Sequence, residues 1–100
     1  IDGKVSDVMN TMPYESKLLA FGWNVITIDG HNIEEILGAL ENARATKGKP
    51  SVIVAKTIKG KGVSFMETQA SWHGKAPNEE QYNIAVSELT AYKNSLGGNN

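Results

Sequence analysis

The sequence predicts an α/β fold, the terminal part of a parallel-sheet domain that contains one βαβ unit and a C-terminal helix. Three observations predict it: residues 23–29 are strand-like in content, residues 33–40 repeat apolar side chains at helical spacing, and residues 51–56 form an apolar run. Parallel strands need a crossover connection of a dozen or more residues, which is usually a helix. The helix between the two predicted strands therefore indicates that they pair in parallel. The length of 100 residues suits one domain and no more.

The first strand and the helix after it have clear local signals. Trp23–Asp29 is rich in β-branched and aromatic residues, and a turn is expected at Gly30–His31. Asn32 is a predicted N-cap, with Glu35 three residues later as its capping-box partner. The predicted apolar face of the helix has the i, i+3, i+4, i+7 spacing and consists of Ile33, Ile36, Leu37 and Leu40.

The second strand, Ser51–Lys56, follows a helix stop at Lys47–Pro50 and is apolar on both faces, so it is expected to be fully buried. Two parallel strands are not a self-sufficient sheet. We therefore expect the sequence to be the end of a larger α/β domain, an expectation that the start at Ile1 without methionine also favours. Residues 1–94 are assigned to that domain and residues 95–100 to a flexible tail.

The flanking segments are less regular. Pro13–Phe21 is a candidate helix, whereas residues 57–77 show no sustained periodicity, and a loop of that length is usually functional or disordered. A last helix is expected after Asn78, which Gln81 answers in a second capping box. Its predicted apolar face consists of Tyr82, Ala85, Val86 and Leu89.

Composition excludes several classes of protein. Ten Lys and Arg against 11 Asp and Glu argue against a dedicated nucleic-acid-binding domain, which would be clearly basic. The absence of cysteine excludes disulfides, thiol nucleophiles and cysteine-ligated metals, and two histidines do not make a histidine-rich zinc centre. No apolar run approaches the roughly 18–20 residues of a membrane span. We expect a cytoplasmic protein.

Positive charge is concentrated locally. Residues 42–66 contain no Asp or Glu but six cations: Arg44, Lys47, Lys49, Lys56, Lys59 and Lys61. The last three surround Gly60 and Gly62 beyond the carboxyl end of the second strand, where ligands bind in open parallel sheets. Glycines allow close backbone approach, and lysines neutralise phosphate. The segment therefore predicts a site for an anionic, phosphorylated ligand, with a solvated basic loop as the alternative.

His73 is the second candidate site residue. It lies in a polar loop between Trp72 and Gly74, where an imidazole is able to donate to a phosphate or hydroxyl or to move a proton near neutral pH. An ordinary surface histidine is the alternative. His31 lies in the turn before a helix, and a structural role in that turn is favoured for it.

Three segments in register resemble transketolase: Trp23–His31, Lys56–Gly62 and Ser71–Pro77. The resemblance extends from Ile1 to about Leu89 and corresponds to the closing part of the thiamine-diphosphate-binding domain. It is closest to transketolases that are split into two subunits, of which this sequence resembles the tail of the N-terminal one.

The resemblance implies transfer of a two-carbon ketol unit from a ketose phosphate to an aldose phosphate, with thiamine diphosphate as cofactor. Lys59 aligns with a family lysine near the diphosphate. His73 aligns with a histidine that contacts both the diphosphate and the sugar, which makes it the expected catalytic and substrate-binding residue.

The family motif for Mg²⁺ and diphosphate, and the glutamate that activates the aminopyrimidine, are absent from this sequence. The resemblance thus implies that the Mg²⁺ ligands lie outside the chain and that the chain is inactive alone. It would need the upstream part of its domain, the second domain or subunit, and a further copy, as a homodimer or heterotetramer.

Two other functions remain open from the residues alone. One is a non-catalytic βαβ interaction module whose basic loop binds anions. The other, RNA binding, is poorly supported, because the loop around Lys56–Lys61 has one aromatic residue, Phe65, and no stacking platform.

Overall fold

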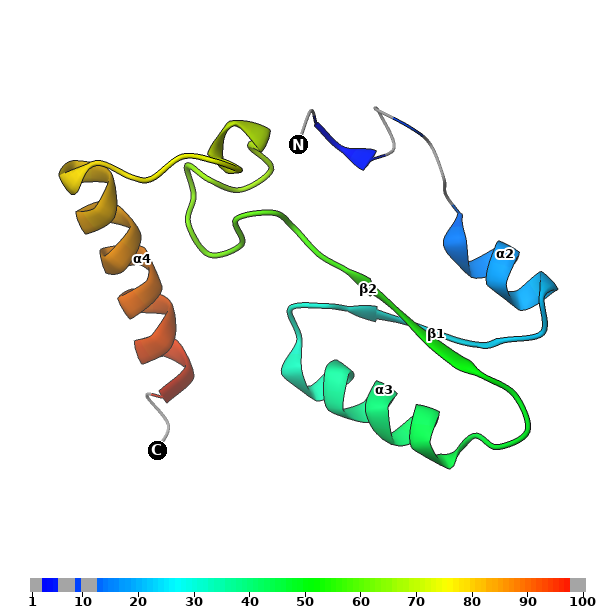
Figure 1. The fold of residues 1–100 in the computed structure, drawn as a ribbon. Helices are drawn as coiled ribbons and strands as arrows, with labels where there is room; N and C mark the ends of the chain where they lie inside the picture. The colour runs from blue at the N-terminus through cyan, green and yellow to red at the C-terminus, as the bar shows by residue number, and fades with distance from the viewer. Residues whose placement is uncertain (1–2, 6–8, 10–12, 98–100) are drawn as a thin grey trace. The chain divides into compact units, whose positions relative to one another are not determined.

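The computed structural model describes residues 3–5, 9 and 13–97 (Figure 1). The chain divides into two compact units, Met9–Thr57 and Ile1–Val8 with Ile58–Asn100. The elements in chain order are α2 (Tyr14–Ala20), β1 (Asn24–Asp29), α3 (Ile33–Ala45), β2 (Ser51–Lys56), the 3-10 helix η1 (Ala70–Trp72) and α4 (Glu79–Gly97).

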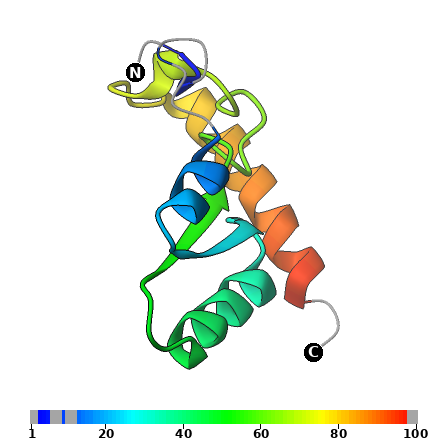
Figure 2. The ribbon, with the colours of Figure 1, turned by 90° about the vertical axis from the view of Figure 1, so that its right-hand side faces the viewer.

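The Met9–Thr57 unit contains the predicted βαβ motif. β1 and β2 pair in parallel, in a register that runs from Asn24 opposite Ser51 to Asp29 opposite Lys56. Both α2 and α3 contact both strands. Figures 1 and 2 show the two helices on opposite sides of the strands, so each face of the small sheet is covered by one helix, as parallel sheets require. The α/β fold class and the short helix before β1 are confirmed.

The expectation that the second strand is fully buried is wrong. In β2 the first four residues are half-buried, and Ala55 and Lys56 are exposed. In β1 only Ile28 is buried, at 8% exposure. The physical reason is that each strand has a single neighbour among residues 13–97, while one seven-residue helix covers one of the faces. Apolar side chains on both faces of a strand show that the strand is suited to burial. They are buried only where further strands or helices pack against those faces.

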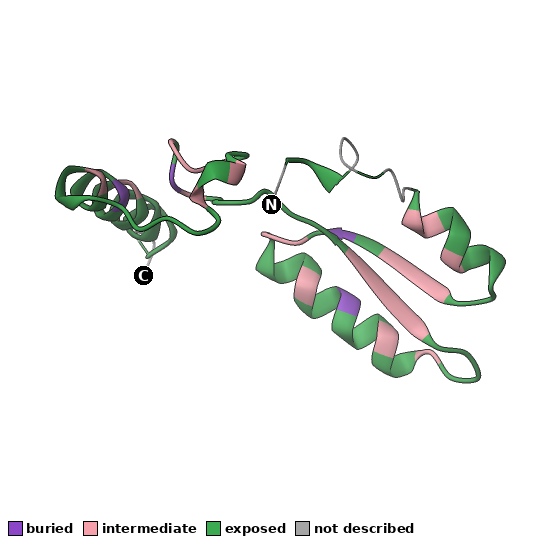
Figure 3. Cartoon of the chain, turned by 45° about the horizontal axis from the view of Figure 1, so that its top comes forward, coloured by how far each residue is buried: buried purple, intermediate pink, exposed green. Residues whose placement is uncertain are grey.

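The predicted apolar face of α3 is wrong in its orientation. The less exposed strip of the helix consists of Ile36, Ala39 and Ala43, with Ala39 at 3% exposure (Figure 3). Small side chains let the helix lie close to the strands. Three of the four predicted face residues are instead largely exposed: Ile33 at 67%, Leu37 at 59% and Leu40 at 46%.

The start of α3 is capped, but in a different way from the expected capping box. Asn32 accepts a hydrogen bond from the Glu35 N–H at 3.1 Å, as predicted. Glu35 does not complete the box, since its Oε1 accepts from the Asp29 N–H at 3.1 Å, while the Asn32 N–H donates to the Asp29 carbonyl. The Glu35 side chain thus ties the first turn of α3 to the end of β1.

Asn24 joins three elements at the other end of the unit. Its Nδ2 lies 3.0 Å from Asn42 Oδ1, 3.2 Å from Thr46 Oγ1 and 3.1 Å from Ser51 Oγ. These acceptors lie on α3, at its C-cap and on the first residue of β2. One amide therefore links the beginnings of both strands to the end of the helix that connects them.

In the second unit, the long segment after β2 forms a compact loop. The Lys59 carbonyl accepts from the Thr68 N–H at 2.9 Å and closes the 59–68 loop. Val63 is buried at 7% exposure. Thr68 has a φ of 62°, the only positive φ among the non-glycine residues that the structure describes. A loop with closed ends and a buried side chain of its own is an Ω-type loop, which is ordered without a helix or strand.

α4 begins with the predicted capping box. The Gln81 N–H donates to Asn78 Oδ1 at 2.8 Å, and the Asn78 N–H donates to Gln81 Oε1 at 2.9 Å. The helix continues through Gly97, so residues 95–97 of the expected tail are helical. Residues 98–100 lie outside the described residues, and the domain boundary at 94 stays a prediction.

The predicted apolar face of α4 is wrong except for Ala85, which is buried at 9% exposure. The half-buried residues beside it are polar, Gln81 and Glu88. The other predicted members are exposed, namely Tyr82 at 57%, Val86 at 41% and Leu89 at 45%. The strip of α4 that is covered is therefore partly polar: Gln81 accepts from the Asn78 N–H at the start of the helix, and Glu88 accepts from the Ser64 N–H of the loop.

Gly38 and Gly30 offer a matched test of the βαβ unit. Gly38 lies inside α3 with open space around its missing Cβ, so Gly38→Ala should stabilise the protein by about 1 kcal/mol through helix propensity. A Cβ on Gly30 would lie 2.6 Å from Thr57 Cγ2, so Gly30→Ala should destabilise it. Urea unfolding followed by circular dichroism at 222 nm measures both. The same direction of change for both variants would contradict the packing described.

Gly60 and Gly74 test the closure of the 59–68 loop. A Cβ on Gly60 would lie 2.6 Å from the Met66 carbonyl oxygen, on a backbone with φ of 76°. Gly60→Ala should therefore open the loop. Amide hydrogen exchange at Thr68 should become about tenfold faster or more, because the Thr68 N–H then loses its hydrogen bond to the Lys59 carbonyl. Gly74→Ala, at a glycine with open space around it, is the control. Unchanged Thr68 exchange in Gly60→Ala would show that the loop is not closed as described.

Candidate functional site

Lys59 and His73, the two site residues predicted from the sequence, lie in the same unit, in its Ile58–Asn100 part. Both are exposed. Neither side chain makes a hydrogen bond or ion pair with any other residue that the structure describes. The charged and polar ends of both side chains are therefore available to a ligand.

Lys59 extends from a backbone that is fixed on both sides. Its carbonyl is held by Thr68, and Gly60 and Gly62 follow with φ values of 76° and 101°. Residues with a Cβ rarely adopt this left-handed backbone conformation, so glycine is needed where the loop reverses direction. The nearest acid in sequence, Glu67, accepts from the Gly62 N–H at 3.1 Å. Its carboxylate thus serves the loop backbone, and no ion pair joins it to Lys59 among the described residues.

The six cations of the basic segment do not form one site. Arg44 pairs with Glu41, and Lys56 lies 4.0 Å from Glu15. Lys47 and Lys49 precede β2 whereas Lys56 ends it, and six extended residues span about 20 Å. The structure thus divides a run that is continuous in sequence, and Lys59 and Lys61 are the members that share the 59–68 loop.

His73 follows η1, and its N–H donates to the Ala70 carbonyl at 3.0 Å. The neighbouring Trp72 fixes this segment to the 59–68 loop. Its Nε1 donates to the Phe65 carbonyl at 3.2 Å, and the two rings lie 5.4 Å apart at 55°. The backbone that carries His73 is therefore anchored to the loop that carries Lys59.

Sequence reasoning missed the residues that make this anchor. In the sequence Phe65 is only an isolated aromatic residue, and Trp72 is only a neighbour of His73. Lys75 adds a third member, since its Nζ lies 4.7 Å from the centre of the Trp72 ring. Such a cation–π contact at an exposed site contributes about 0.5–1 kcal/mol. Two aromatic residues seven positions apart in a glycine-containing loop are the signal from which the ring contact was predictable.

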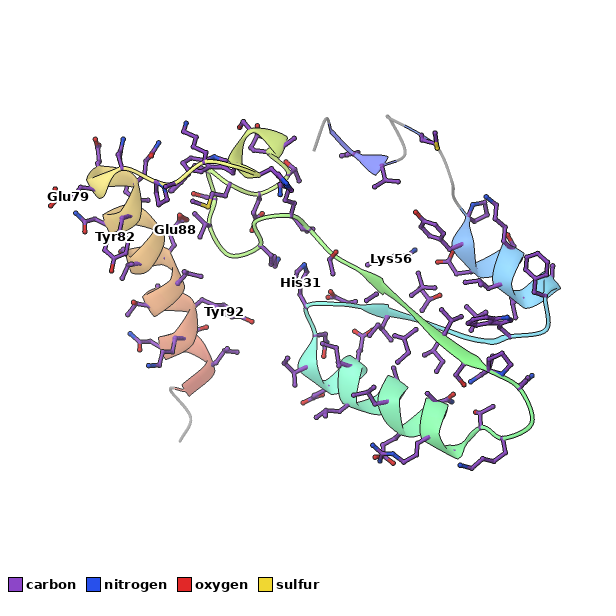
Figure 4. All side chains as sticks on the ribbon, in the orientation of Figure 1. His31, Lys56, Glu79, Tyr82, Glu88 and Tyr92 are labelled. Atoms are coloured by element: carbon purple, nitrogen blue, oxygen red, sulfur yellow. The ribbon has the colours of Figure 1, made fainter. Side chains whose placement is uncertain are left out.

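His31 lies apart from these residues in the sequence and belongs to the Met9–Thr57 unit, at the end of β1 (Figure 4). Its N–H donates to Asp29 Oδ1 at 2.9 Å, which forms an Asx-type turn. This agrees with the structural role favoured for it. Among the described residues there is no group of three or more His, Cys, Asp or Glu side chains suited to hold a metal ion.

The arrangement is able to bind an anion. Lys59 offers a charge without a competing carboxylate partner among the described residues. His73 offers a ring that donates or accepts. No helix within the described ranges is long and apolar enough to cross a membrane.

Comparison with known proteins assigns the chain. Residues 1–96 match the sequence model of the transketolase thiamine diphosphate binding domain. The chain is 47% identical over 89 residues to the 6-deoxy-6-sulfo-D-fructose transketolase subunit SqwG of Clostridium sp. (strain MSTE9), and the match covers 89% of this chain and 32% of the relative. It is 38% identical over 90 residues to an apulose-4-phosphate transketolase subunit of Phocaeicola vulgatus, covering 90% of the chain and 32% of the relative.

Human transketolase is 45% identical over 62 residues, which cover 62% of this chain and 10% of that protein. The chain thus spans about a third of the length of the two subunit relatives. The family match extends over both compact units and includes the segments that carry Lys59 and His73. The chain belongs to the transketolase family, within its thiamine diphosphate-binding domain.

Proposed function

We propose that this chain is part of a transketolase that transfers a two-carbon ketol unit from a ketose phosphate to an aldose phosphate. The observation that supports this most is the family match over residues 1–96. The Ile58–Asn100 unit adds a physical argument, because Lys59 and His73 have exposed side chains on segments that are tied together. The covalent chemistry of ketol transfer is supplied by thiamine diphosphate when it is bound.

Lys59 and His73 have different roles in this proposal. The Lys59 ammonium neutralises the diphosphate as a fixed positive charge, which its anchored loop holds in place. The His73 imidazole donates a hydrogen bond to the diphosphate or the sugar and moves a proton at a reacting hydroxyl, as general acid–base catalysis requires. Both residues fit an anionic group, because neither side chain is paired with a carboxylate of the described residues.

The proposal includes partners. Two relatives are named as transketolase subunits, which supports a chain that works with the remainder of its domain and with a second domain or subunit. We propose that it is inactive alone, that the complete enzyme is a homodimer or heterotetramer in the cytoplasm, and that Mg²⁺ is held by residues outside this chain. The sugars in the names of these relatives differ, so no particular sugar phosphate is assigned.

His73→Ala in the assembled enzyme should lower kcat about 10²–10⁴-fold, since that is the usual contribution of a general acid–base group. His31→Ala removes the other histidine, in the turn after β1, and is the control. Steady-state ketol transfer, with thiamine diphosphate titrated separately, measures both variants. Unchanged transfer together with unchanged cofactor affinity in His73→Ala would remove its assigned role.

Lys59→Ala should weaken thiamine diphosphate binding about tenfold, the loss expected for one hydrogen bond to a charged group. Lys59→Arg keeps the charge and should recover part of the affinity. Lys49→Ala, which removes a lysine that precedes β2, is the control for a general change in net charge. Isothermal titration of the assembled enzyme gives the dissociation constants. Equal constants for Lys59→Ala and Lys49→Ala would count against a diphosphate contact.

A further inference from the structure

We propose that Glu88 of α4 is a positioning residue, which holds the 59–68 loop on the helix and so places Lys59 for its anionic ligand. The Ser64 N–H lies 3.2 and 3.3 Å from the two carboxylate oxygens of Glu88, and Ser64 Oγ lies 3.0 Å from its Oε1. One carboxylate thus accepts from both the backbone and the side chain of one loop residue. The consequence for the ligand rests on the proposed function.

Glu88 is distinguished from the other acids of α4 by its position. Glu79 and Glu80 are exposed in the first turn, where negative charge suits the helix dipole. Glu88 is half-buried, one turn after the buried Ala85. Figure 4 shows it on the side of α4 nearest the loop, with Glu79 at the start of the helix. A carboxylate in the covered strip of a helix, where an apolar residue is expected, needs donors, and Ser64 provides two.

These contacts are the hydrogen-bonded link between loop and helix. Between residues 59–73 and α4, as far as the structure describes them, the bonds from Ser64 to Glu88 are the only hydrogen bonds. Apolar contacts accompany them, because Val63 and Ala85 are buried and a Cβ on Gly62 would lie 3.1 Å from Leu89 Cδ2. Hydrogen bonds to a charged group are about twice as strong as neutral ones. Glu88 therefore provides the polar part of the attachment between the loop and α4.

The shape of the loop is determined separately from its location. Lys59 is bonded to Thr68, and the Gly62 N–H is bonded to Glu67, so the loop stays closed without Glu88. Loss of the Glu88 carboxylate should thus loosen an intact loop on the helix. Cofactor affinity should fall, since the ligand must then order the loop as it binds. The rate at saturating cofactor should change little, because binding restores the same arrangement.

The first arm of the test is structural and needs no ligand. In the assembled enzyme, Glu88→Ala should speed amide hydrogen exchange at Ser64 about tenfold, with exchange at Gly62 unchanged because Glu67 holds it. Glu88→Gln should give a smaller effect, since the amide oxygen still accepts a hydrogen bond. Glu79→Ala, an exposed acid of the same helix, is the control and should change neither amide. Unchanged exchange at Ser64 in Glu88→Ala overturns the proposal.

The second arm is kinetic. Glu88→Ala should raise the KM for thiamine diphosphate about tenfold and leave kcat at saturating cofactor within about twofold, with partial rescue in Glu88→Gln. A merely structural role would instead lower kcat or the protein yield, and it would not raise the KM while kcat stays unchanged. An unchanged KM overturns the proposal. Failure of the proposed function is distinguishable, because the enzyme with native Glu88 would then show no dependence on thiamine diphosphate, and the exchange arm alone would decide whether Glu88 positions the loop.

Discussion

Scarcity of apolar burial is the constraint on which the rest of this structure depends. The apolar residues that are buried within the described ranges are Ile28, Ala39, Val63 and Ala85, and two of them are alanines. Fully burying a large apolar side chain contributes about 1.5–3 kcal/mol, whereas ordering each residue costs about 1–2 kcal/mol of backbone entropy. Polar contacts therefore carry much of the local order: Asn24 between strands and helix, Glu35 at the start of α3, and Glu88 between α4 and the loop.

The same constraint explains the exposed apolar strips of the two longer helices. α3 covers its strands with small residues and leaves Leu37 exposed. α4 contacts its loop through Glu88 and Leu89 and leaves Tyr82 exposed. Large exposed apolar surfaces are characteristic of interaction sites. The exposed strips therefore agree with the proposal that the chain functions with further parts of a transketolase. The chain spans about a third of the length of the two subunit relatives.

For the candidate site, residue identity and residue position were predictable to different degrees. His73 and Lys59 stand out in the sequence through the motifs around them, and both lie within residues 1–96, which the family model matches. The hydrogen bonds that hold their segments were not predictable. Glu88 is separated by 24 residues from Ser64, and Trp72 reaches Phe65 through an indole N–H whose acceptor is a backbone carbonyl. Hydrogen bonds of this kind depend on how the loop folds back, which no periodic pattern encodes.

The sequence by itself determined the order and type of the elements, because caps, turn residues and apolar spacing act within a few residues of one another. The Asn78–Gln81 box and the βαβ order are examples. Only the tertiary structure decided which helix faces are covered, since both helices carry more apolar surface than two strands and one loop are able to cover. It also divided the basic run, because β2 is extended and separates Lys49 from Lys56. Lysines that are neighbours in sequence stay together in space only where the chain folds back. Lys59 and Lys61 do so, because the loop that carries them is closed by the bond from the Thr68 N–H to the Lys59 carbonyl.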